Sequence, residues 1–259
     1  MTQKQTEIIA FINNKGGVSK TTSSVSVGSI LASKGYDVLL VDLDAQANLT
    51  ASLLKGEYRE NLYTAMTGKS DLPIVNVKEH LDVVPASLNL SLAEIELSTV
   101  IAREMILSRL LQPLKGRYDF IILDCPPALG LMTINAFAAS TNIIVPTIAE
   151  VLPFEGLKTV FLFIQKVKSG LNSGTKLLGV LITRYKKVKN SMEIETRLRS
   201  QLQELVFETK IRENTTVSSA PGYKQDIVTF DANCNGAKDY TTFTEELLQR
   251  LNMSAYEKV

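Results

Sequence analysis

The sequence predicts an α/β protein in which helices cover both faces of a mostly parallel, twisted β-sheet. Three features of the 259-residue chain support this prediction. Short apolar runs alternate with longer segments of helical periodicity, which is the pattern of strand–helix–strand units. The runs are almost wholly hydrophobic, which indicates strands buried on both faces. No repeat, low-complexity segment or linker divides the chain, so we expect a single domain over residues 1–259.

The predicted elements follow one another along the chain. Strands are expected at residues 8–12, 38–41, 81–84, 120–123, 143–145 and 177–182. Pro126 should close the fourth strand and Pro146 the fifth, because proline has no N–H for sheet pairing. Helices are expected at about residues 20–34, 89–112, 131–139, 154–168, 191–205 and 238–251. Gly35 is expected to stop the first helix.

Charge, cysteine and histidine content exclude several classes of protein. Lys and Arg number 28 against 27 Asp and Glu, a formal net charge of +1, so any contact with DNA must come from a local patch. Cys125 and Cys234 form no CxxC motif and His80 is the only histidine, so no zinc site or disulfide framework is expected. The N-terminal MTQKQTE lacks the layout of a signal peptide, and no run reaches about 20 apolar residues. We therefore expect a cytoplasmic protein that does not bind membranes.

The segment NNKGGVSKTT, residues 13–22, has the composition and position of a phosphate-binding loop. It follows a buried strand and opens a helix. Gly16 and Gly17 let the backbone bend tightly, so that successive N–H groups and the positive end of the helix dipole face an anion. Lys20 can reach terminal phosphates, and the Thr21 hydroxyl can bind Mg²⁺. The alternative is a chance glycine-rich turn.

Acidic residues end two of the predicted strands. Asp42 and Asp44 end the second in VDLDAQANLT, residues 41–50, and Asp124 ends the fourth in YDFIILDCPP, residues 118–127. Ligands of such sheets bind at the carboxyl ends of the strands. An apolar strand ending in aspartate is a Walker B pattern, whose carboxylate holds Mg²⁺ through water. Asp42 and Asp44 could instead cap the following helix, and Cys125 is expected to be a small buried side chain.

From about residue 7 to residue 251, these motifs resemble the deviant Walker A ATPases of the ParA/MinD family. They are most similar to the small, Soj-like ParA partition ATPases that lack an N-terminal DNA-binding domain. The strict pattern G-x-x-x-x-G-K-[ST] fails, because Asn14 and Ser19 occupy its glycine positions, and K-G-G-x-x-K-T remains. The resemblance implies a P-loop NTPase fold and a weak ATPase that uses ATP and Mg²⁺. It also implies a homodimer with ATP at the interface, where Lys15 reaches the nucleotide of the partner subunit, in the way an arginine finger does.

The resemblance also implies roles for single residues. Asp44 orients or activates the attacking water, and Lys15 and Lys20 complete the catalytic set. Ser19 departs from the glycine usual in the family; if its position needs a positive φ, serine costs about 1 kcal/mol, with effects on affinity and turnover. The expected nucleotide contacts are Lys15, Gly16, Gly17, Val18, Ser19, Lys20, Thr21 and Thr22, with Arg184, Ile211 and Arg212 at adenine, and the expected Mg²⁺ residues are Thr21, Asp42 and Asp124.

Several functions within the family remain open. A ParA-type partition ATPase dimerises on ATP, binds DNA without sequence preference on the nucleoid, and hydrolyses ATP when a ParB-like partner engages. A MinD-type membrane protein is disfavoured because the last residues, FTEELLQRLNMSAYEKV, lack a strongly cationic face. A reductase like the nitrogenase iron protein is disfavoured because the surroundings of Cys125 and Cys234 do not resemble cluster ligands. A positioning or regulatory ATPase for another cargo, or a slow ATP switch, is the main alternative.

The expected DNA contact is a local basic cluster. In the late loop ENTTVSSAP, residues 213–221, Glu213 and Thr216 occupy positions where basic residues are common in the family. Just upstream, RYKKVKNSMEIETRLR, residues 184–199, holds six basic and two acidic residues. A solvated charged loop is the alternative to DNA binding by this cluster. The residues expected to bind the DNA backbone, doubled by dimerisation, are Lys186, Lys187, Lys189, Arg197 and Arg199.

Overall fold

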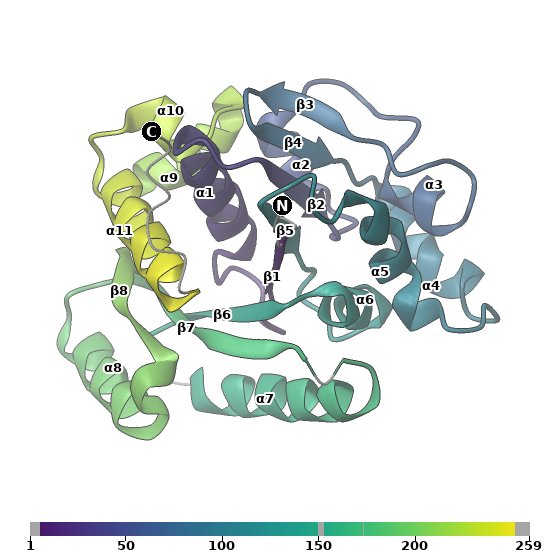
Figure 1. The fold of residues 1–259 in the computed structure, drawn as a ribbon. Helices are drawn as coiled ribbons and strands as arrows, with labels where there is room; N and C mark the ends of the chain where they lie inside the picture. The colour runs from purple at the N-terminus through teal and green to yellow at the C-terminus, as the bar shows by residue number, and fades with distance from the viewer. Residues whose placement is uncertain (1–5, 150–152, 173, 252–259) are drawn as a thin grey trace.

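One eight-stranded sheet forms the centre of the computed structural model, which describes residues 6–149, 153–172 and 174–251 (Figure 1). The strand order is β3-β4-β2-β5-β1-β6-β7-β8, and every neighbouring pair is parallel except β3 and β4. The mostly parallel sheet is therefore confirmed. The strands are β1 (Glu7–Phe11), β2 (Val38–Asp42), β3 (Val75–Lys78), β4 (Leu81–Val84), β5 (Phe120–Asp124), β6 (Asn142–Ile148), β7 (Lys176–Tyr185) and β8 (Val206–Arg212).

Helices cover both faces of the sheet, because successive strand residues point to opposite sides. In β1, Ile8 and Ala10 enter one hydrophobic core, whereas Ile9 and Phe11 enter the other. The first core includes residues of α5, α6 and α7, and the second includes residues of α1 and α11. The helices are α1 (Lys20–Ser33), α2 (Asn48–Leu53), α3 (Leu62–Met66), α4 (Ala93–Glu96), α5 (Ile106–Leu111), α6 (Leu131–Ala139), α7 (Pro153–Gly170), α8 (Lys189–Leu202), α9 (Thr215–Ser219), α10 (Ile227–Asp231) and α11 (Asn235–Arg250).

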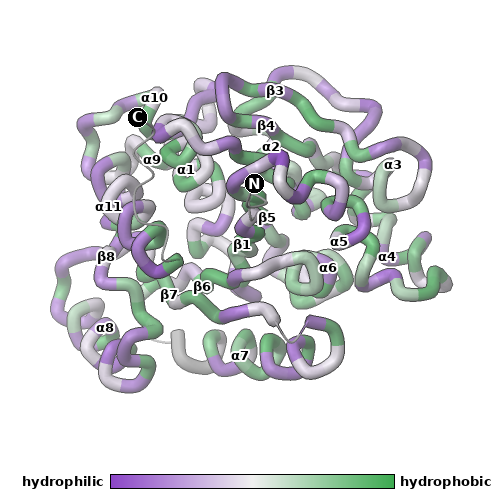
Figure 2. Tube along the Cα trace, in the orientation of Figure 1, coloured by the Kyte–Doolittle hydropathy of each residue, from purple (hydrophilic) through white to green (hydrophobic). Residues whose placement is uncertain are grey.

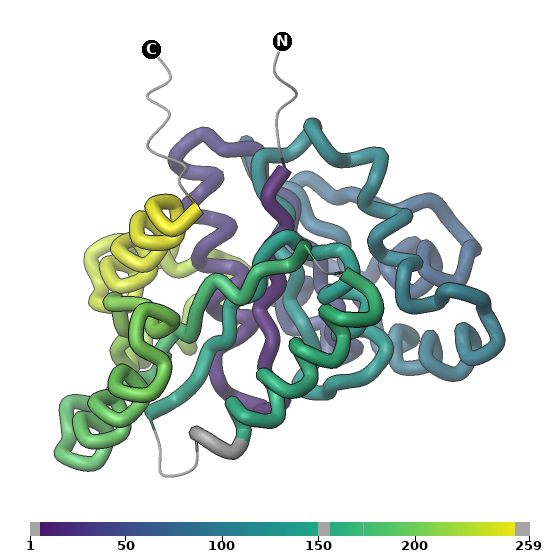
Figure 3. Tube along the Cα trace, turned by 60° about the horizontal axis from the view of Figure 1, so that its bottom comes forward, coloured from purple at the N-terminus to yellow at the C-terminus, as the bar shows by residue number. Residues whose placement is uncertain are grey.

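The pictures show how this order spreads the chain across the molecule. The helices that follow β2 and β4 gather at one end, and those that follow β7 and β8 gather at the other (Figure 3). Along α8 and α11 the colour alternates between hydrophilic and hydrophobic (Figure 2), as expected for helices with one buried face. Ile194 and Leu198 of α8 are indeed buried, and Leu202 is half-buried.

The structure differs from the sequence-based expectation mainly at the sheet edges. β3 and β8 were not predicted, because both are edge strands with polar residues among the apolar ones. The expectation that Pro146 closes the fifth strand is wrong, since β6 runs on to Ile148. Beyond Ile144, β6 pairs with β7 but no longer with β1, and one-sided pairing is where a sheet tolerates proline.

Two helix boundaries test the local signals in the sequence. Gly35 adopts a φ of 83° directly after α1 and its C-cap Lys34, so it stops the helix as predicted. The region predicted as one or two helices over residues 89–112 is broken into α4, α5 and short 3-10 turns. Ala102, with a φ of 54°, lies in the interruption, where a helix cannot continue.

Candidate functional site

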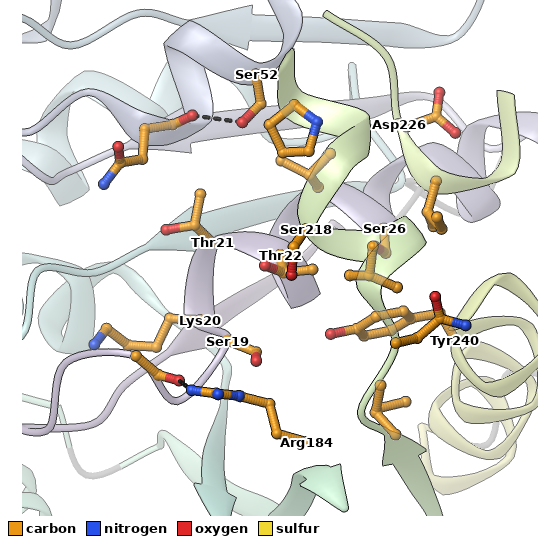
Figure 4. Close-up of a pocket in the computed structure, with 18 of the residues that line it drawn as sticks. Ser19, Lys20, Thr21, Thr22, Ser26, Ser52, Arg184, Ser218, Asp226 and Tyr240 are labelled. Atoms are coloured by element: carbon orange, nitrogen blue, oxygen red, sulfur yellow. Dashed lines mark hydrogen bonds between the residues drawn. The ribbon is translucent and has the colours of Figure 1, made fainter. Parts of the chain in front are cut away.

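A cavity of about 1300 Å³ opens at the carboxyl ends of the parallel strands. It lies where the loop after β1, the turn after β2 and the ends of β7 and β8 meet. In Figure 4, Ser19, Lys20 and Thr21 lie on the α1 side and Arg184 approaches the same loop, while Tyr240 and Asp226 lie farther along the cavity. The predicted site residues in its lining are Gly16, Gly17, Ser19, Lys20, Thr21, Thr22, Asp44, Arg184, Ile211 and Arg212.

The loop before α1 contains two residues in left-handed backbone conformation. Gly17 has a φ of 73°, which glycine adopts freely. Ser19 has a φ of 63° and is the N-cap of α1, but its side chain makes no capping hydrogen bond. Position 19 therefore does require a positive φ, and serine there carries a backbone penalty of about 1 kcal/mol. The bend that this conformation produces sends α1 away from the cavity with its N-terminal end facing it.

Lys20 is held inside the loop that it is expected to serve. Its side chain is buried, and Nζ donates a hydrogen bond to the Lys15 carbonyl at 3.0 Å. Burial lowers the pKa of Lys20, while the carboxylates of Asp124 and Asp44 act against that shift. A partly desolvated ammonium attracts an anion more strongly than an exposed one does. When an anion binds, Lys20 Nζ could donate to a phosphate oxygen in place of the Lys15 carbonyl.

Asp124 presents a buried oxygen with no partner among the described residues. Its Oδ1 accepts a hydrogen bond from Ser24 Oγ at 3.2 Å, whereas Oδ2 is buried and unpaired there. Burial raises its pKa to about 8, with a further rise from Asp42, against hydrogen bonds from Thr21 and Ser24 and the charge of Lys20. A buried carboxylate oxygen without a donor destabilises the fold unless a cation or its water binds there.

These residues fit Mg²⁺. The described residues contain no group of three or more His, Cys, Asp or Glu side chains that could hold a metal ion. Mg²⁺ commonly takes one or two protein ligands and completes its shell with water and phosphate oxygens. Thr21 and Asp124, whose side chains interact, would be those protein groups.

Asp42 is engaged by protein donors instead. Its Oδ2 accepts hydrogen bonds from Thr50 N at 2.9 Å and Thr50 Oγ1 at 2.7 Å, and its Oδ1 accepts one from Asp44 N at 3.2 Å. Burial raises its pKa to about 6. These bonds tie α2 to the end of β2, which favours the capping alternative for Asp42. Asp44 is half-buried in the cavity lining, and its own N–H connects it to Asp42.

The remaining predicted nucleotide residues lie around the loop. Val18 is buried, and its carbonyl accepts a hydrogen bond from Thr183 Oγ1, so it fixes the loop to β7. Lys15 is exposed, and its Cε lies 3.5 Å from the position that a Cβ would take at Gly156 of α7. The role of Lys15 across a dimer interface stays a prediction.

Two supporting residues were missed by the sequence analysis. Asn13 donates to the Pro146 carbonyl at 2.6 Å and accepts from Lys15 N at 3.0 Å, which holds the start of the loop. Tyr240 of α11 lines the cavity and hydrogen-bonds Ser23 of α1 at 3.1 Å. No local motif marks a residue like Tyr240, because its role follows only from the packing of α11 on α1. Arg212, which was expected to contact adenine, donates hydrogen bonds from Nε and Nη2 to the Asp239 carboxylate of α11.

The predicted basic cluster is only partly assembled. Lys186, Lys187 and Arg199 line a second cavity of about 930 Å³, whereas Lys189 and Arg197 lie outside its lining. Arg199 is largely committed within the chain, because it pairs with Glu195 and Glu208 and donates to two backbone carbonyls. This pairing explains why a count of basic residues overstates the charge available to a ligand.

Within the described ranges, no helix has the length and apolar character needed to cross a bilayer. Residues 252–259, which form the end of the segment considered for membrane attachment, lie outside the described residues.

Comparisons with known proteins identify the family of this chain. The family model described as "AAA domain" matches residues 6–177. The chain is 38% identical to the sporulation initiation inhibitor protein Soj of Bacillus subtilis, over 93% of this chain and 98% of the relative. It is 36% identical to the chromosome-partitioning ATPase Soj of Treponema pallidum, over 93% and 97% of the two chains.

Solved structures resemble the fold over nearly its whole length. Cobyrinic acid a,c-diamide synthase from Mycobacterium smegmatis, with a bound ATP analog and magnesium, has a TM-score of 0.83 and 32% identity, over 95% of this chain and 96% of that one. A plasmid partition protein from Borrelia burgdorferi bound to AMPPNP has a TM-score of 0.82 and 27% identity, over 95% and 100%. On the family model and these relatives, the chain belongs to the AAA domain family matched here, and within it to the ParA/MinD-type P-loop ATPases.

The charge state of Asp124 gives a first prediction. Between the ordinary carboxyl pKa of 3.8 and about 8, the folded protein keeps a proton that the unfolded chain releases. Asp124 therefore contributes a loss of stability as pH rises through that interval. In Mg²⁺-free protein we expect the melting temperature of Asp124→Asn to fall less between pH 6 and pH 8 than that of wild type.

The same variant should lose the stabilisation given by an ATP analogue with Mg²⁺. Melting curves with and without that ligand measure both effects. Asp71→Asn, at an exposed position outside the cavity lining, is the matched control and should behave as wild type. Equal Mg²⁺-dependent stabilisation of Asp124→Asn and wild type would contradict the metal assignment.

Proposed function

We propose that this chain is a partition ATPase that dimerises on ATP and Mg²⁺, binds DNA without sequence preference as the dimer, and hydrolyses ATP when a ParB-like partner engages. The observation that supports it most is the loop around Gly16 and Gly17. In it Lys20 lines the cavity and interacts with the buried Asp124 carboxylate, one oxygen of which is unpaired among the described residues. The partition assignment draws on relatives named for chromosome partitioning, including ParA of Myxococcus xanthus at 36% identity. The protein would act in the cytoplasm, on the nucleoid.

The residues of the loop divide the work on the nucleotide. The backbone of residues 16–19 bends around the phosphates, and the N-terminal end of α1 adds its free N–H groups. Lys20 neutralises the terminal phosphates. Thr21 and Asp124 would hold Mg²⁺, which would supply further neutralisation of the phosphate charge. Asp44, fixed through Asp42 and α2, positions the attacking water. Lys15 of one subunit serves the nucleotide of the other.

The protein on its own should turn over slowly. Lys15 must cross an interface before the site is complete, and Ser19 adds strain to the loop. A site that is completed only by assembly suits an ATPase whose activity a partner stimulates. The alternative is a related positioning ATPase or slow switch for another cargo, which the internal pairing of Arg199 favours.

DNA retention with and without ATP decides between these two functions. Wild type should bind random-sequence duplex DNA with ATP and Mg²⁺, and weaken as salt increases. Changing Lys186, Lys187 and Lys189 together to Glu should abolish this binding while nucleotide affinity stays unchanged. Each phosphate contact that is lost should reduce the slope of log affinity against log salt by roughly 1.

The matched control makes the same charge change at three lysines outside both cavities. Lys34, Lys55 and Lys176 lie outside the linings of both cavities, so changing them to Glu should leave DNA binding much closer to wild type. DNA binding that survives the Lys186, Lys187 and Lys189 substitutions would reject this cluster. No DNA binding by wild type under any nucleotide condition would favour another cargo.

A further inference from the structure

The end of β7 and the segment after β8 separate the nucleotide cavity from the second cavity. Arg212 and Glu213 line both of them. The second cavity is lined by five basic residues but only two acidic ones, Glu195 and Glu213. Arg199, Lys210 and Arg212 are paired with acidic residues of the chain. The charge that this cavity offers to a polyanion such as a nucleic acid backbone therefore comes mainly from Lys186 and Lys187. Because the Glu213 carboxylate lines both cavities, a charged ligand in either one would act on it.

Contacts of Glu213 connect the phosphate-binding loop to the second cavity. Its Oε1 accepts from Arg184 Nη2 at 3.2 Å, and its Oε2 accepts from Lys186 Nζ at 2.8 Å. Arg184 in turn donates from Nη1 to the Gly17 carbonyl at 3.4 Å, a bond drawn in Figure 4. A continuous set of contacts thus runs from Gly17 through Arg184 and Glu213 to Lys186.

These ion pairs are weak enough to exchange partners. The side chain of Lys186 is 59% exposed and that of Glu213 is 37% exposed, and exposed ion pairs contribute little because water competes for both charges. The other acid in the cavity behaves differently, since Glu195 is 12% exposed and holds Arg199 and Lys210 together. Lys186 is therefore the cation whose release would change the charge offered to a ligand most easily.

We propose that Glu213 is an internal anion that competes with DNA phosphates for Lys186, and that the phosphates of nucleotide bound near Gly17 relieve this competition by repelling the Glu213 carboxylate. The proposal rests on the DNA binding proposed above and names its regulation. Phosphates in the loop would repel the Glu213 carboxylate, which lines the same cavity. This repulsion would loosen Glu213 from Lys186. Without nucleotide, Lys186 above all holds the pKa of Glu213 below its usual range, so the carboxylate is ionised while it competes for that cation.

Removing the charge of Glu213 should mimic the effect of nucleotide. We expect Glu213→Gln to bind a fluorescent random-sequence duplex about 3-fold to 10-fold more tightly than wild type without nucleotide, as loss of a weak competing ion pair predicts. With an ATP analogue and Mg²⁺ the two proteins should differ less, so the stimulation by nucleotide should shrink. Fluorescence anisotropy at low and high salt measures both quantities.

A matched control separates position from net charge. Glu245→Gln makes the same charge change at an exposed residue that pairs with Lys34, outside both cavity linings. It should leave DNA affinity and nucleotide stimulation as in wild type. Adding Lys186→Met to Glu213→Gln should cancel the gain, because the released cation is then missing.

The outcomes separate this inference from the proposed function. If wild type binds DNA with ATP but Glu213→Gln shows the same affinity and stimulation, or Glu245→Gln reproduces its gain, the role of Glu213 is overturned and the DNA function stands. If neither wild type nor Glu213→Gln binds DNA while both bind nucleotide, DNA binding itself is rejected. Tight nucleotide-free binding by Glu213→Gln alone supports the internal anion.

Discussion

Replacing Lys20 by alanine is expected to abolish nucleotide binding by this protein. The variant removes the only cation that is buried within the described part of the loop, next to Asp124 and Asp44. A charge-assisted hydrogen bond to a desolvated phosphate contributes about 3 kcal/mol, so affinity should fall about 100-fold or more. Titration calorimetry with an ATP analogue and Mg²⁺ measures the loss.

The fold should tolerate this change, because the Lys20 side chain lines the cavity and is not part of the hydrophobic core. Its Nζ bonds a loop carbonyl, and the loop is also held by Asn13 and by Thr183. Lys34→Ala, at the other end of α1 in an exposed ion pair with Glu245, is the control and should keep wild-type affinity. A folded Lys20→Ala protein with wild-type affinity would contradict phosphate binding by this loop.

Replacing Asp44 by alanine should stop hydrolysis while ATP-driven dimerisation persists. Asp44 lies in the cavity lining, and its Oδ1 accepts a hydrogen bond from Gln46 N at 3.0 Å. A group that orients or activates the attacking water commonly contributes about 100-fold or more to the rate. Phosphate release measures turnover, and sedimentation with ATP and Mg²⁺ measures the dimer.

Turnover and dimerisation together distinguish a catalytic role of Asp44 from a structural one. Loss of dimerisation together with hydrolysis would show that Asp44 has a structural role, in line with its link to Asp42 and α2. Unchanged turnover would remove Asp44 from the mechanism altogether. Asp71→Ala, an exposed aspartate outside the cavity lining, should leave both quantities as in wild type.

The sequence predicted the centre of this fold better than its edges. β2 and β5 are buried on every residue, so an uninterrupted apolar run marks each of them. β8 mixes buried and exposed residues, and its position depends on pairing with β7, which no local pattern contains. The short helices α9 and α10 likewise follow from the course of the late segment over α1 and not from periodicity.

The site divides in the same way. Lys20, Thr21 and Asp124 could be predicted because each lies at a fixed distance from a strand end or a helix start. The sequence predicted strain at Ser19 only if this position needs a positive φ. The structure gives it a φ of 63°. The pairing of Glu213 with Arg184 and Lys186 could not be predicted, because it joins residues on two separate strand ends. Charge counts alone made residues 184–199 look more available to DNA than their ion pairs allow.

A crystal structure of the protein with a non-hydrolysable ATP analogue and Mg²⁺ tests the central claim most directly. The account predicts a two-fold dimer with phosphates cradled by residues 16–20, the metal between Thr21 and Asp124, and Lys15 directed at the nucleotide of the other subunit. An empty loop at saturating nucleotide, or a nucleotide bound to a monomer with Lys15 turned away from every phosphate, would contradict it.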